Sequence, residues 1–188
     1  MKRIGIYGGS FNPIHNGHIA IAKEMIAQAC LDEVWLMVSP QNPLKPIGSL
    51  LDDDKRLLMA QTAVKGIPGI KASDYEFRLP RPSYMWNTLQ SLSRDYPDCT
   101  FTLLIGADNW AVFPQWHRAD DIIAHYPICI HPRTGYPLDP SSLPATVRLI
   151  DTPLHDVSST QVRELIAQGK DISTLVPQSI IPLATKFY

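Results

Sequence analysis

The 188-residue sequence has few cysteines, no long apolar run and no excess of charge of either sign. Cys30, Cys99 and Cys129 are far apart and form no C-x-x-C pair, which argues against a disulfide framework. No stretch approaches the ~18 apolar residues of a membrane span. The 17 basic and 18 acidic side chains nearly cancel, which argues against a nucleic-acid partner. We therefore expect a cytoplasmic protein that engages neither membrane nor nucleic acid.

Several common enzyme signatures are also absent. The chain contains neither the dinucleotide fingerprint G-x-G-x-x-G nor a P-loop ending in G-K-[ST]. It has no G-x-S-x-G nucleophile elbow and no protein-kinase motif set. Ser159, His155 and Asp156 are adjacent in the sequence, whereas a catalytic triad is assembled from distant loops. These absences argue against Walker-type, kinase and serine-hydrolase chemistry.

The length and an apolar content of 45% fit a single domain covering residues 1–188. Continuous apolar runs at 34–38 and 101–105 are typical of buried parallel strands, and segments with helical spacing lie between the predicted strands. A further short strand is predicted at 70–77. A helix is predicted to begin at 83 or 84, with a core-facing stripe of Met85, Leu89, Leu92 and Tyr96. This alternation predicts an α/β fold with a doubly wound parallel sheet. Ligands of such sheets gather at the carboxyl ends of the strands.

The most informative stretch is G-G-S-F-N-P-I-H-N-G-H at residues 8–18. It joins a short apolar strand to a helical pattern, so it presents backbone N–H groups and a positive helix end to an anion. His15 and His18 are three residues apart and can face the same side. We do not expect them to bind a metal, because no third ligand lies nearby in the sequence. The predicted phosphate-binding residues of this turn are Gly8, Gly9, Ser10 and Phe11.

A second anion-binding helix start is predicted at residues 157–163, V-S-S-T-Q-V-R. Ser158 and Gln161 fit a capping box, but three successive hydroxyl residues exceed what a cap requires. Arg163 lies about one turn into the helix, and helical side chains lean back toward the N-terminus, so its guanidinium can reach an anion there. The candidate nucleotide contacts are Ser158, Ser159 and Thr160.

Two further segments carry charged residues. Lys45 is the only charge of the Pro-rich loop at 39–49, where it is equally consistent with a phosphate contact and with a solvated lysine. The aspartates at 52–54 open the next helix. Acidic residues in a first turn complement the helix dipole, so we interpret them as capping residues rather than metal ligands.

Further candidate ligand-binding residues follow the later predicted strands. Gly106 and Asp108 come directly after the run at 101–105, a place suited to holding a ribose or a Mg²⁺-bound phosphate. Trp116 is either a core residue or a ring that stacks on a planar ligand, because its neighbours are unusually polar for a buried tryptophan. Arg133 lies at the end of the strand predicted at 126–131.

Two anion-binding helix starts, two histidines and an arginine exceed what one monophosphate needs, so they favour a nucleoside triphosphate. The chain offers no obvious nucleophile for a covalent intermediate. This leaves direct attack of a substrate phosphate on the α-phosphorus, with expulsion of pyrophosphate. A phosphate monoester has a second pKa of about 6 and needs no general base near pH 7. Mg²⁺ is expected with ATP, held mainly by ATP oxygens and water.

Residues 8–18 resemble the G-x-F-x-P-x-H-x-G-H signature of the HxGH nucleotidyltransferase superfamily, and 157–163 are similar to its I-S-S-T-x-[IV]-R motif. Within that superfamily the whole chain resembles the bacterial nicotinate-nucleotide adenylyltransferases. The resemblance implies a Rossmann-like nucleotidyltransferase fold. It also implies transfer of AMP from ATP to nicotinate mononucleotide, giving deamido-NAD and pyrophosphate, with Mg²⁺ accompanying ATP.

The same resemblance assigns roles to individual positions. His15, His18 and Arg163 would be catalytic, and Asp108 would hold the nucleotide near its ribose. On the acceptor side, Trp116 would stack on the pyridine ring and Thr88 would lie near the nicotinate. The remaining residues expected to bind the acceptor are Lys45, Tyr84 and Arg133.

Leu44 and Met85 depart from the family pattern, which usually has His and Thr at these positions. Both changes remove a hydrogen-bonding group near the expected mononucleotide pocket. Nicotinamide mononucleotide and phosphopantetheine therefore remain alternative acceptors. A non-catalytic regulatory module that binds nucleotide is a further alternative, although the intact His15, His18 and Arg163 argue against it. A homo-oligomer is compatible with the sequence.

Overall fold

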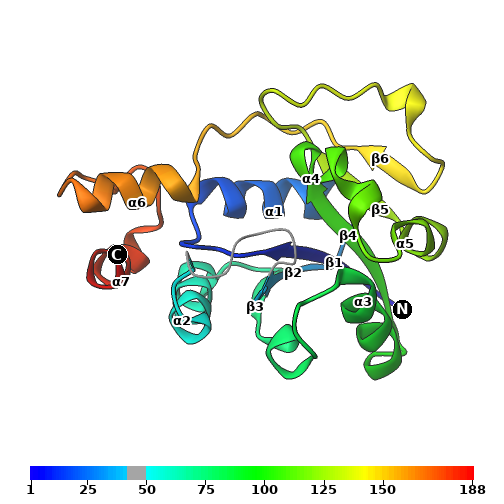
Figure 1. Ribbon diagram of the computed structural model, residues 1–188, viewed down its shortest axis with the longest axis horizontal. Coiled ribbons are helices and arrows are strands. Elements are labelled where there is room, and N and C mark those ends of the chain that lie inside the picture. Colours follow the sequence, from blue (N-terminus) through cyan, green and yellow to red (C-terminus); the bar gives the residue numbers. More distant parts are fainter. Residues whose placement is uncertain (42–49) are drawn as a thin grey trace.

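The computed structural model describes residues 1–41 and 50–188 and shows a central sheet flanked by helices (Figure 1). Six strands form one parallel sheet in the order β3-β2-β1-β4-β5-β6. They are β1 (Lys2–Gly9), β2 (Glu33–Val38), β3 (Ile70–Ser73), β4 (Cys99–Gly106), β5 (Ile128–His131) and β6 (Val147–Leu149). The predicted α/β class with a doubly wound parallel sheet is confirmed.

Seven α-helices connect and cover the described strands. They are α1 (Asn16–Gln28), α2 (Asp53–Val64), α3 (Met85–Asp95), α4 (Ala107–Ala111), α5 (Ala119–His125), α6 (Ser159–Ala167) and α7 (Ile181–Phe187). Short 3₁₀ turns occur at Tyr75–Arg78, Phe113–Gln115, Pro140–Ser142 and Gln178–Ile180. Within residues 1–41 and 50–188, none of the helices has both the length and the apolar character required to span a bilayer.

Two hydrophobic cores lie on opposite faces of the sheet, because successive side chains of a strand point to opposite sides. Leu104 of β4 belongs to the core that α1, α2, α6 and α7 share. Its neighbours Leu103 and Ile105 belong to the core that α3 and α5 cover. Both cores are almost completely closed to solvent, so the two layers of helices fix the sheet from both sides.

The strand order reverses beside β1, which pairs with β2 on one side and with β4 on the other. The chain fills one half of the sheet through β2 and β3 and then crosses over to build the other half. Connections after β1 and β4 therefore leave in different directions. This divergence opens a crevice at the carboxyl ends of the two strands, which is the usual ligand position in such sheets.

The strand predicted at 70–77 is shorter than expected. The β3 ladder ends at Ser73, whose hydroxyl accepts a hydrogen bond from the N–H of Tyr75 at 3.2 Å. The chain then turns into the 3₁₀ segment, which buries Tyr75 and Glu76. In α3, Leu89 and Leu92 are buried as the spacing predicts, but Met85 lines a pocket and Tyr96 is 36% exposed.

The aspartates before α2 act mainly through ion pairs. The side chain of Asp52, at the N-cap position, makes no capping hydrogen bond to the described backbone, and it pairs instead with Lys55 at 2.8 Å. Asp53 pairs with Arg56 at 2.6 Å and with Arg81 at 2.7 Å. The prediction of side-chain capping at Asp52 was therefore wrong, although the negative charges still complement the helix dipole.

Arg56 is a fully buried cation on α2. Besides its pairing with Asp53, its guanidinium donates to the carbonyl oxygens of Ser10 at 2.5 Å, Ser39 at 3.0 Å and Leu51 at 2.8 Å. These carbonyls belong to the loops after β1 and β2 and to the start of α2. One side chain thus satisfies polar groups from three separate segments, which a buried charge requires.

Replacing Arg56 by Ala should lower the free energy of unfolding by about 3–5 kcal/mol, because three carbonyl oxygens lose their donor inside the protein. The adjacent Lys55→Ala variant serves as the control, since it removes an exposed ion pair with Asp52 and a long cation–π contact with Phe187, and should change stability by about 1 kcal/mol or less. Urea unfolding at pH 7 measures both. Similar losses for the two variants would contradict the structural role given to Arg56.

Candidate active site

The turn between β1 and α1 begins at Ser10 and leads into α1 at Asn16. Phe11 adopts a left-handed backbone conformation with φ of 43°, which is uncommon for a residue other than glycine. Its buried ring packs edge-on against His18 at 5.0 Å and against Tyr7 at 6.0 Å. Packing of this ring stabilises a backbone shape that the residue alone would disfavour.

The start of α6 is hydrogen-bonded directly to this turn. Arg163 donates from Nη1 to the carbonyl oxygen of Asn12 at 2.6 Å, and Ser159 donates from Oγ to that of Pro13 at 2.8 Å. Arg163 also donates from Nη2 to the hydroxyl of Thr160 at 3.2 Å. The structure therefore joins the two stretches that the sequence singles out, although about 150 residues separate them along the chain.

These bonds fix how the peptide groups of the turn point. In a planar trans peptide the carbonyl and the following N–H point in opposite directions. Since the carbonyl of Ser10 faces Arg56, the N–H of Phe11 faces away from α2. By the same rule, the N–H of Ile14 points away from Ser159, which binds the carbonyl of Pro13, whereas the carbonyl of Asn12 is followed by a proline without an N–H. The N–H groups of Phe11 and Ile14 thus point away from these side-chain donors, as an anion-binding turn requires.

His15 and His18 lie one above the other, with ring centroids 3.6 Å apart and an interplanar angle of 24°. The N–H of His15 donates to Nδ1 of His18 at 3.2 Å, so a neutral His18 carries its proton on Nε2. Burial, with smaller contributions from Arg133 and His155, lowers the pKa of His15 to about 3. His15 is therefore neutral near pH 7, which also avoids repulsion between two stacked cations.

A buried polar pair lies next to the histidines. The hydroxyl of Tyr7 is 3.5 Å from Nε2 of His131, and Nδ1 of His131 is 3.2 Å from the carbonyl oxygen of Pro132. Burial is the main cause that lowers the pKa of His131 to about 4, so its ring is neutral. Its Nδ1–H then donates to Pro132, and Nε2 accepts from Tyr7. Burial also raises the pKa of Tyr7 and keeps its hydroxyl protonated.

Asp108 and Arg133 face each other across the ends of β4 and β5. Arg133 Nε is 3.6 Å from Asp108 Oδ1, and neither atom hydrogen-bonds to any residue within 1–41 or 50–188. A Cβ on Gly106 would collide with that carboxylate oxygen, so glycine is needed at the strand end. The pair combines an anion and a cation whose hydrogen-bonding capacity is not used by the described protein groups.

A first cavity lies beside this pair. It is lined by Ile21 of α1, by residues 131–134 after β5 and by residues 154–158 before α6. Ser158, whose hydroxyl accepts from the N–H of Gln161 at 3.1 Å, lies at its edge and caps α6 as predicted. In the described part of the chain, no group of three or more His, Cys, Asp or Glu side chains has an arrangement suited to a metal ion.

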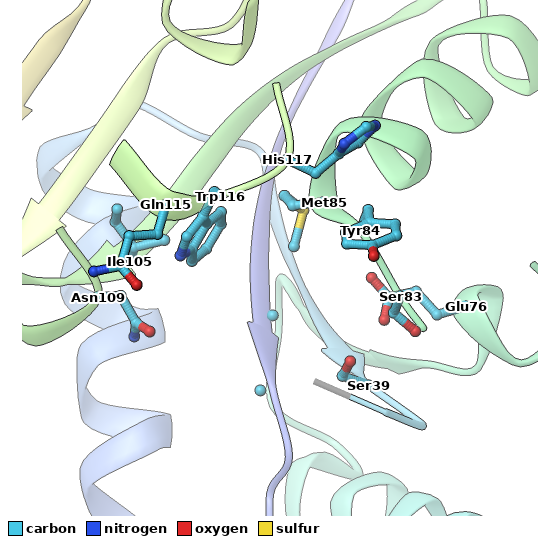
Figure 2. Close-up of a pocket in the computed structure, with 12 residues that line it drawn as sticks. Ser39, Glu76, Ser83, Tyr84, Met85, Ile105, Asn109, Gln115, Trp116 and His117 are labelled. Carbon is cyan, nitrogen blue, oxygen red and sulfur yellow. The ribbon is translucent and has the colours of Figure 1, made fainter. Parts of the chain in front are cut away.

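A second pocket opens on the other side of the end of β1, and Figure 2 shows its walls. Side chains that follow β4 form one wall, and side chains before and at the start of α3 form the other. The first wall comprises Ile105, Asn109, Gln115 and Trp116, and the second comprises Glu76, Ser83, Tyr84 and Met85. Gly8 and Gly9 lie between them, so β1 contributes backbone rather than side chains.

Trp116 is the largest ring of this pocket. It packs against Phe113, with ring centroids 5.0 Å apart and tilted by 37°. Its indole Nε1 is buried without a hydrogen-bond acceptor among the described residues. Across the pocket, the ring of Tyr84 contacts that of His117 at 4.8 Å. A flat ligand can therefore find an aromatic surface here and a donor whose partner the described protein does not supply.

Thr88 lies behind the second wall rather than in it. It is 1% exposed, and its hydroxyl donates to Glu76 at 2.8 Å and to the carbonyl of Tyr84 at 3.3 Å. Burial raises the pKa of Glu76, so this carboxyl holds its proton more readily than an exposed one. The contact predicted between Thr88 and a ligand would therefore pass through its neighbours.

The predicted site residues fall into two groups. Ser158 and Arg133 line the first cavity, and Asp108 pairs with Arg133 beside it. Arg133 therefore lies at the first cavity rather than beside Trp116, whereas Gly8 and Gly9 of the turn line the second pocket. Trp116 and Tyr84 line the second pocket. Lys45 and Leu44 lie outside the described residues. The sequence did not identify four residues of the site: Tyr7, Arg56, Glu76 and His131. Of these, only His131 lies at the end of a predicted strand, which is the position where ligand-binding residues are expected.

Comparison with known proteins gives consistent findings. The model of the cytidylyltransferase-like family matches residues 6–165. A probable nicotinate-nucleotide adenylyltransferase of Bacteroides fragilis is 46% identical over 170 residues, covering 90% of this chain and 85% of that protein. A probable nicotinate-nucleotide adenylyltransferase of Cytophaga hutchinsonii is 41% identical over 188 residues, covering 99% of this chain and 98% of that protein.

Among solved structures, the fold matches Plasmodium falciparum nicotinic acid mononucleotide adenylyltransferase complexed with NaAD. The TM-score is 0.84 at 21% identity, with 100% of this chain and 96% of that chain covered. This likeness shows that the two chains share a fold. The chain belongs to the cytidylyltransferase-like family and, within it, to the nicotinate-nucleotide adenylyltransferases.

Proposed function

We propose that this protein transfers the adenylyl group of ATP to nicotinate mononucleotide, forming deamido-NAD and releasing pyrophosphate. One observation carries the proposal: the hydrogen bonds from Arg163 to Asn12 and from Ser159 to Pro13 bring two helix starts together beside a pocket with an aromatic wall. Two helix N-termini suit a polyphosphate, and the adjoining pocket suits a flat ring.

ATP would lie across the two helix starts. The positive ends of α1 and α6 and the N–H groups of the turn favour the negative charge of the triphosphate. Arg163 donates two of its five N–H groups to residues within 1–41 and 50–188, and the described part of the chain supplies no acceptor for the others, which we assign to a phosphate oxygen. Asp108 would bind the ribose. The proposed nucleotide contacts are Gly8, Gly9, Ser10, Phe11, Gly106, Asp108, Ser158, Ser159 and Thr160.

His15 and His18 would act as hydrogen-bond donors to the phosphoryl oxygens. Both need only be neutral for this, because a neutral imidazole still carries one N–H. The backbone bond to Nδ1 of His18 leaves the proton of the neutral ring on Nε2. A bound triphosphate would raise the pKa of each ring and strengthen these bonds further, since a nearby anion favours the protonated form. Donors fixed before the reaction stabilise the charge that develops at phosphorus.

The acceptor phosphate itself is the nucleophile. Its second pKa is about 6, so it is mostly a dianion near pH 7 and needs no base. An acceptor oxygen forms a bond to the α-phosphorus while the bond from that phosphorus to the bridging oxygen of the β-phosphate breaks, and pyrophosphate carries away the electron pair. The protein contributes by alignment and by charge stabilisation, with Arg163, His15 and His18 as the proposed catalytic residues.

Mg²⁺ is proposed to enter with ATP. The described residues supply no cluster of metal-ligating side chains, which suits an ion held mainly by triphosphate oxygens and water. Such an ion neutralises part of the charge on the phosphates. Asp108, which we place at the ribose, has an oxygen that no described group hydrogen-bonds, so it would also be able to accept a hydrogen bond from a water molecule of the ion.

Nicotinate mononucleotide would occupy the second pocket. Its pyridine ring carries a positive charge at the glycosylated nitrogen, so a ring stacked on Trp116 gains a cation–π contribution. Tyr84 would close the opposite side, with Thr88 fixing the wall through Glu76. Arg133 and Lys45 are proposed to contact phosphate, Arg133 from the side of Asp108.

A panel assay tests the proposed function. ATP is supplied with nicotinate mononucleotide, nicotinamide mononucleotide or phosphopantetheine, and pyrophosphate release is followed at pH 7.5. We expect the highest kcat/KM with nicotinate mononucleotide. A higher value with either other acceptor would overturn the assignment. Binding of an ATP analogue without release of pyrophosphate in any combination would identify a regulatory module instead.

Replacing His18 by Ala should lower kcat by about 10²–10³-fold, because one preorganised donor to the transition-state charge is lost. Thermal unfolding should change little, since His18 is only partly buried. His125→Ala is the matched control, because His125 is exposed at the end of α5. A near-normal kcat for the His18 variant would remove this residue from the mechanism.

Replacing Trp116 by Ala should raise KM for nicotinate mononucleotide about tenfold or more and leave KM for ATP much less affected. Stacking of a ring on an aromatic side chain contributes about 1–3 kcal/mol, which sets this range. The Trp116→Phe variant keeps part of the ring surface, so its KM for nicotinate mononucleotide should lie between the values of the wild-type protein and the Trp116→Ala variant. Equal increases in both KM values would contradict the placement of the acceptor against Trp116.

A further inference from the structure

Tyr188, which follows the last helix, α7, contacts the turn at 8–18. Its hydroxyl donates to Oδ1 of Asn12 at 2.5 Å across a separation of 176 positions. Its backbone N–H donates to the carbonyl of Ala184 at 3.1 Å, and Ala184 is fully buried in the core shared by α1 and α2. The tyrosine ring is thus attached to a fixed part of the protein.

Asn12 is the junction that receives this bond. Its side-chain Oδ1 accepts from Tyr188 and from the N–H of Leu51 at 3.2 Å, while its main-chain oxygen accepts from Arg163. The residue is 5% exposed. One asparagine therefore connects the turn to the start of α2, to α6 and to the end of α7. A change at any of these contacts moves the same residue.

The chemistry of the contact gives it a fixed direction. Burial raises the pKa of Tyr188, although Arg163 and Arg56 act the other way, so the hydroxyl is protonated at neutral pH and is the donor. Oδ1 of Asn12 can accept only, so the two bonds to it orient the amide. Asn12 directly follows Phe11, whose left-handed backbone needs support from its surroundings.

We infer that Tyr188 is a positioning residue for the nucleotide: through Asn12 it holds the turn at 8–18 in the shape in which that turn and Arg163 bind the triphosphate. This rests on the proposed function for the identity of the ligand. A tyrosine outside both cavities would then set the affinity for ATP. It would have little influence on the acceptor, which lies on the other side of β1.

Tyr188→Phe tests the inference, because it removes one hydroxyl and keeps the ring. We expect KM for ATP to rise about three- to tenfold, as loss of one buried hydrogen bond predicts. KM for nicotinate mononucleotide should change less than about twofold. Tyr96→Phe is the matched control, because Tyr96 directly follows α3 and is 36% exposed. This variant should change neither the KM for ATP nor the KM for nicotinate mononucleotide. A lowered thermal midpoint with both KM values unchanged would mean that Tyr188 is only structural and would overturn the inference.

A double-mutant cycle tests whether the effect passes through Asn12. Binding of an α,β-methylene analogue of ATP is measured by calorimetry for Tyr188→Phe, Asn12→Ala and the double variant. If Tyr188 acts through Asn12, its replacement weakens binding in the wild-type background and has no further effect beside Asn12→Ala. Additive losses would overturn the inference. The binding measurement needs no turnover, so its result is separate from whether nicotinate mononucleotide is the acceptor.

Discussion

The carbonyl oxygens of the turn between β1 and α1 are the groups on which the site depends. Arg56 binds one of them from α2, and Ser159 and Arg163 bind two more from α6. These donors come from opposite halves of the sequence, so the turn acquires its shape only when the whole sheet and its helices have assembled. Arg56 is fully buried beside the turn and its charge is compensated by Asp53, so it contributes mainly by fixing the carbonyl of Ser10.

Several titratable side chains of the site are neutral or have a pKa shifted toward the neutral form. His15 and His131 are neutral because burial lowers their pKa, and Glu76 holds its proton more readily because burial raises its pKa. Attraction for a polyphosphate therefore comes from helix ends, backbone N–H groups and the guanidinium groups. On the acceptor side, burial favours the neutral form of Glu76, which repels the carboxylate of nicotinate less than the ionised form does. Both cavities can thus hold anions close together.

Local patterns in the sequence were sufficient to predict the sheet and the positions of the two helix starts that we propose to bind anions. Glycines, hydroxyl residues and apolar runs mark such elements through backbone geometry, which acts within a few residues. Arg56 and Glu76 could not be found this way, because each looks like an ordinary surface charge until tertiary structure buries it. The strand predicted at 70–77 ends at Ser73, because the N–H of Tyr75 donates to the Ser73 hydroxyl instead of to the neighbouring strand. Tyr188 had no local pattern that would connect it to Asn12.

Gly8 and Met85 constrain each other. A Cβ built on Gly8 would lie 2.8 Å from the terminal methyl carbon of Met85, so the strand end and the flexible side chain already share the available volume. Position 8 can accept alanine only if the residue at 85 becomes shorter or turns aside. A branched or aromatic replacement of Met85 would in turn press on the backbone at Gly8. The terminal methyl is the end of a flexible side chain, so the contact is relieved when Met85 rotates, and any such rotation changes the volume of the second pocket that Met85 lines.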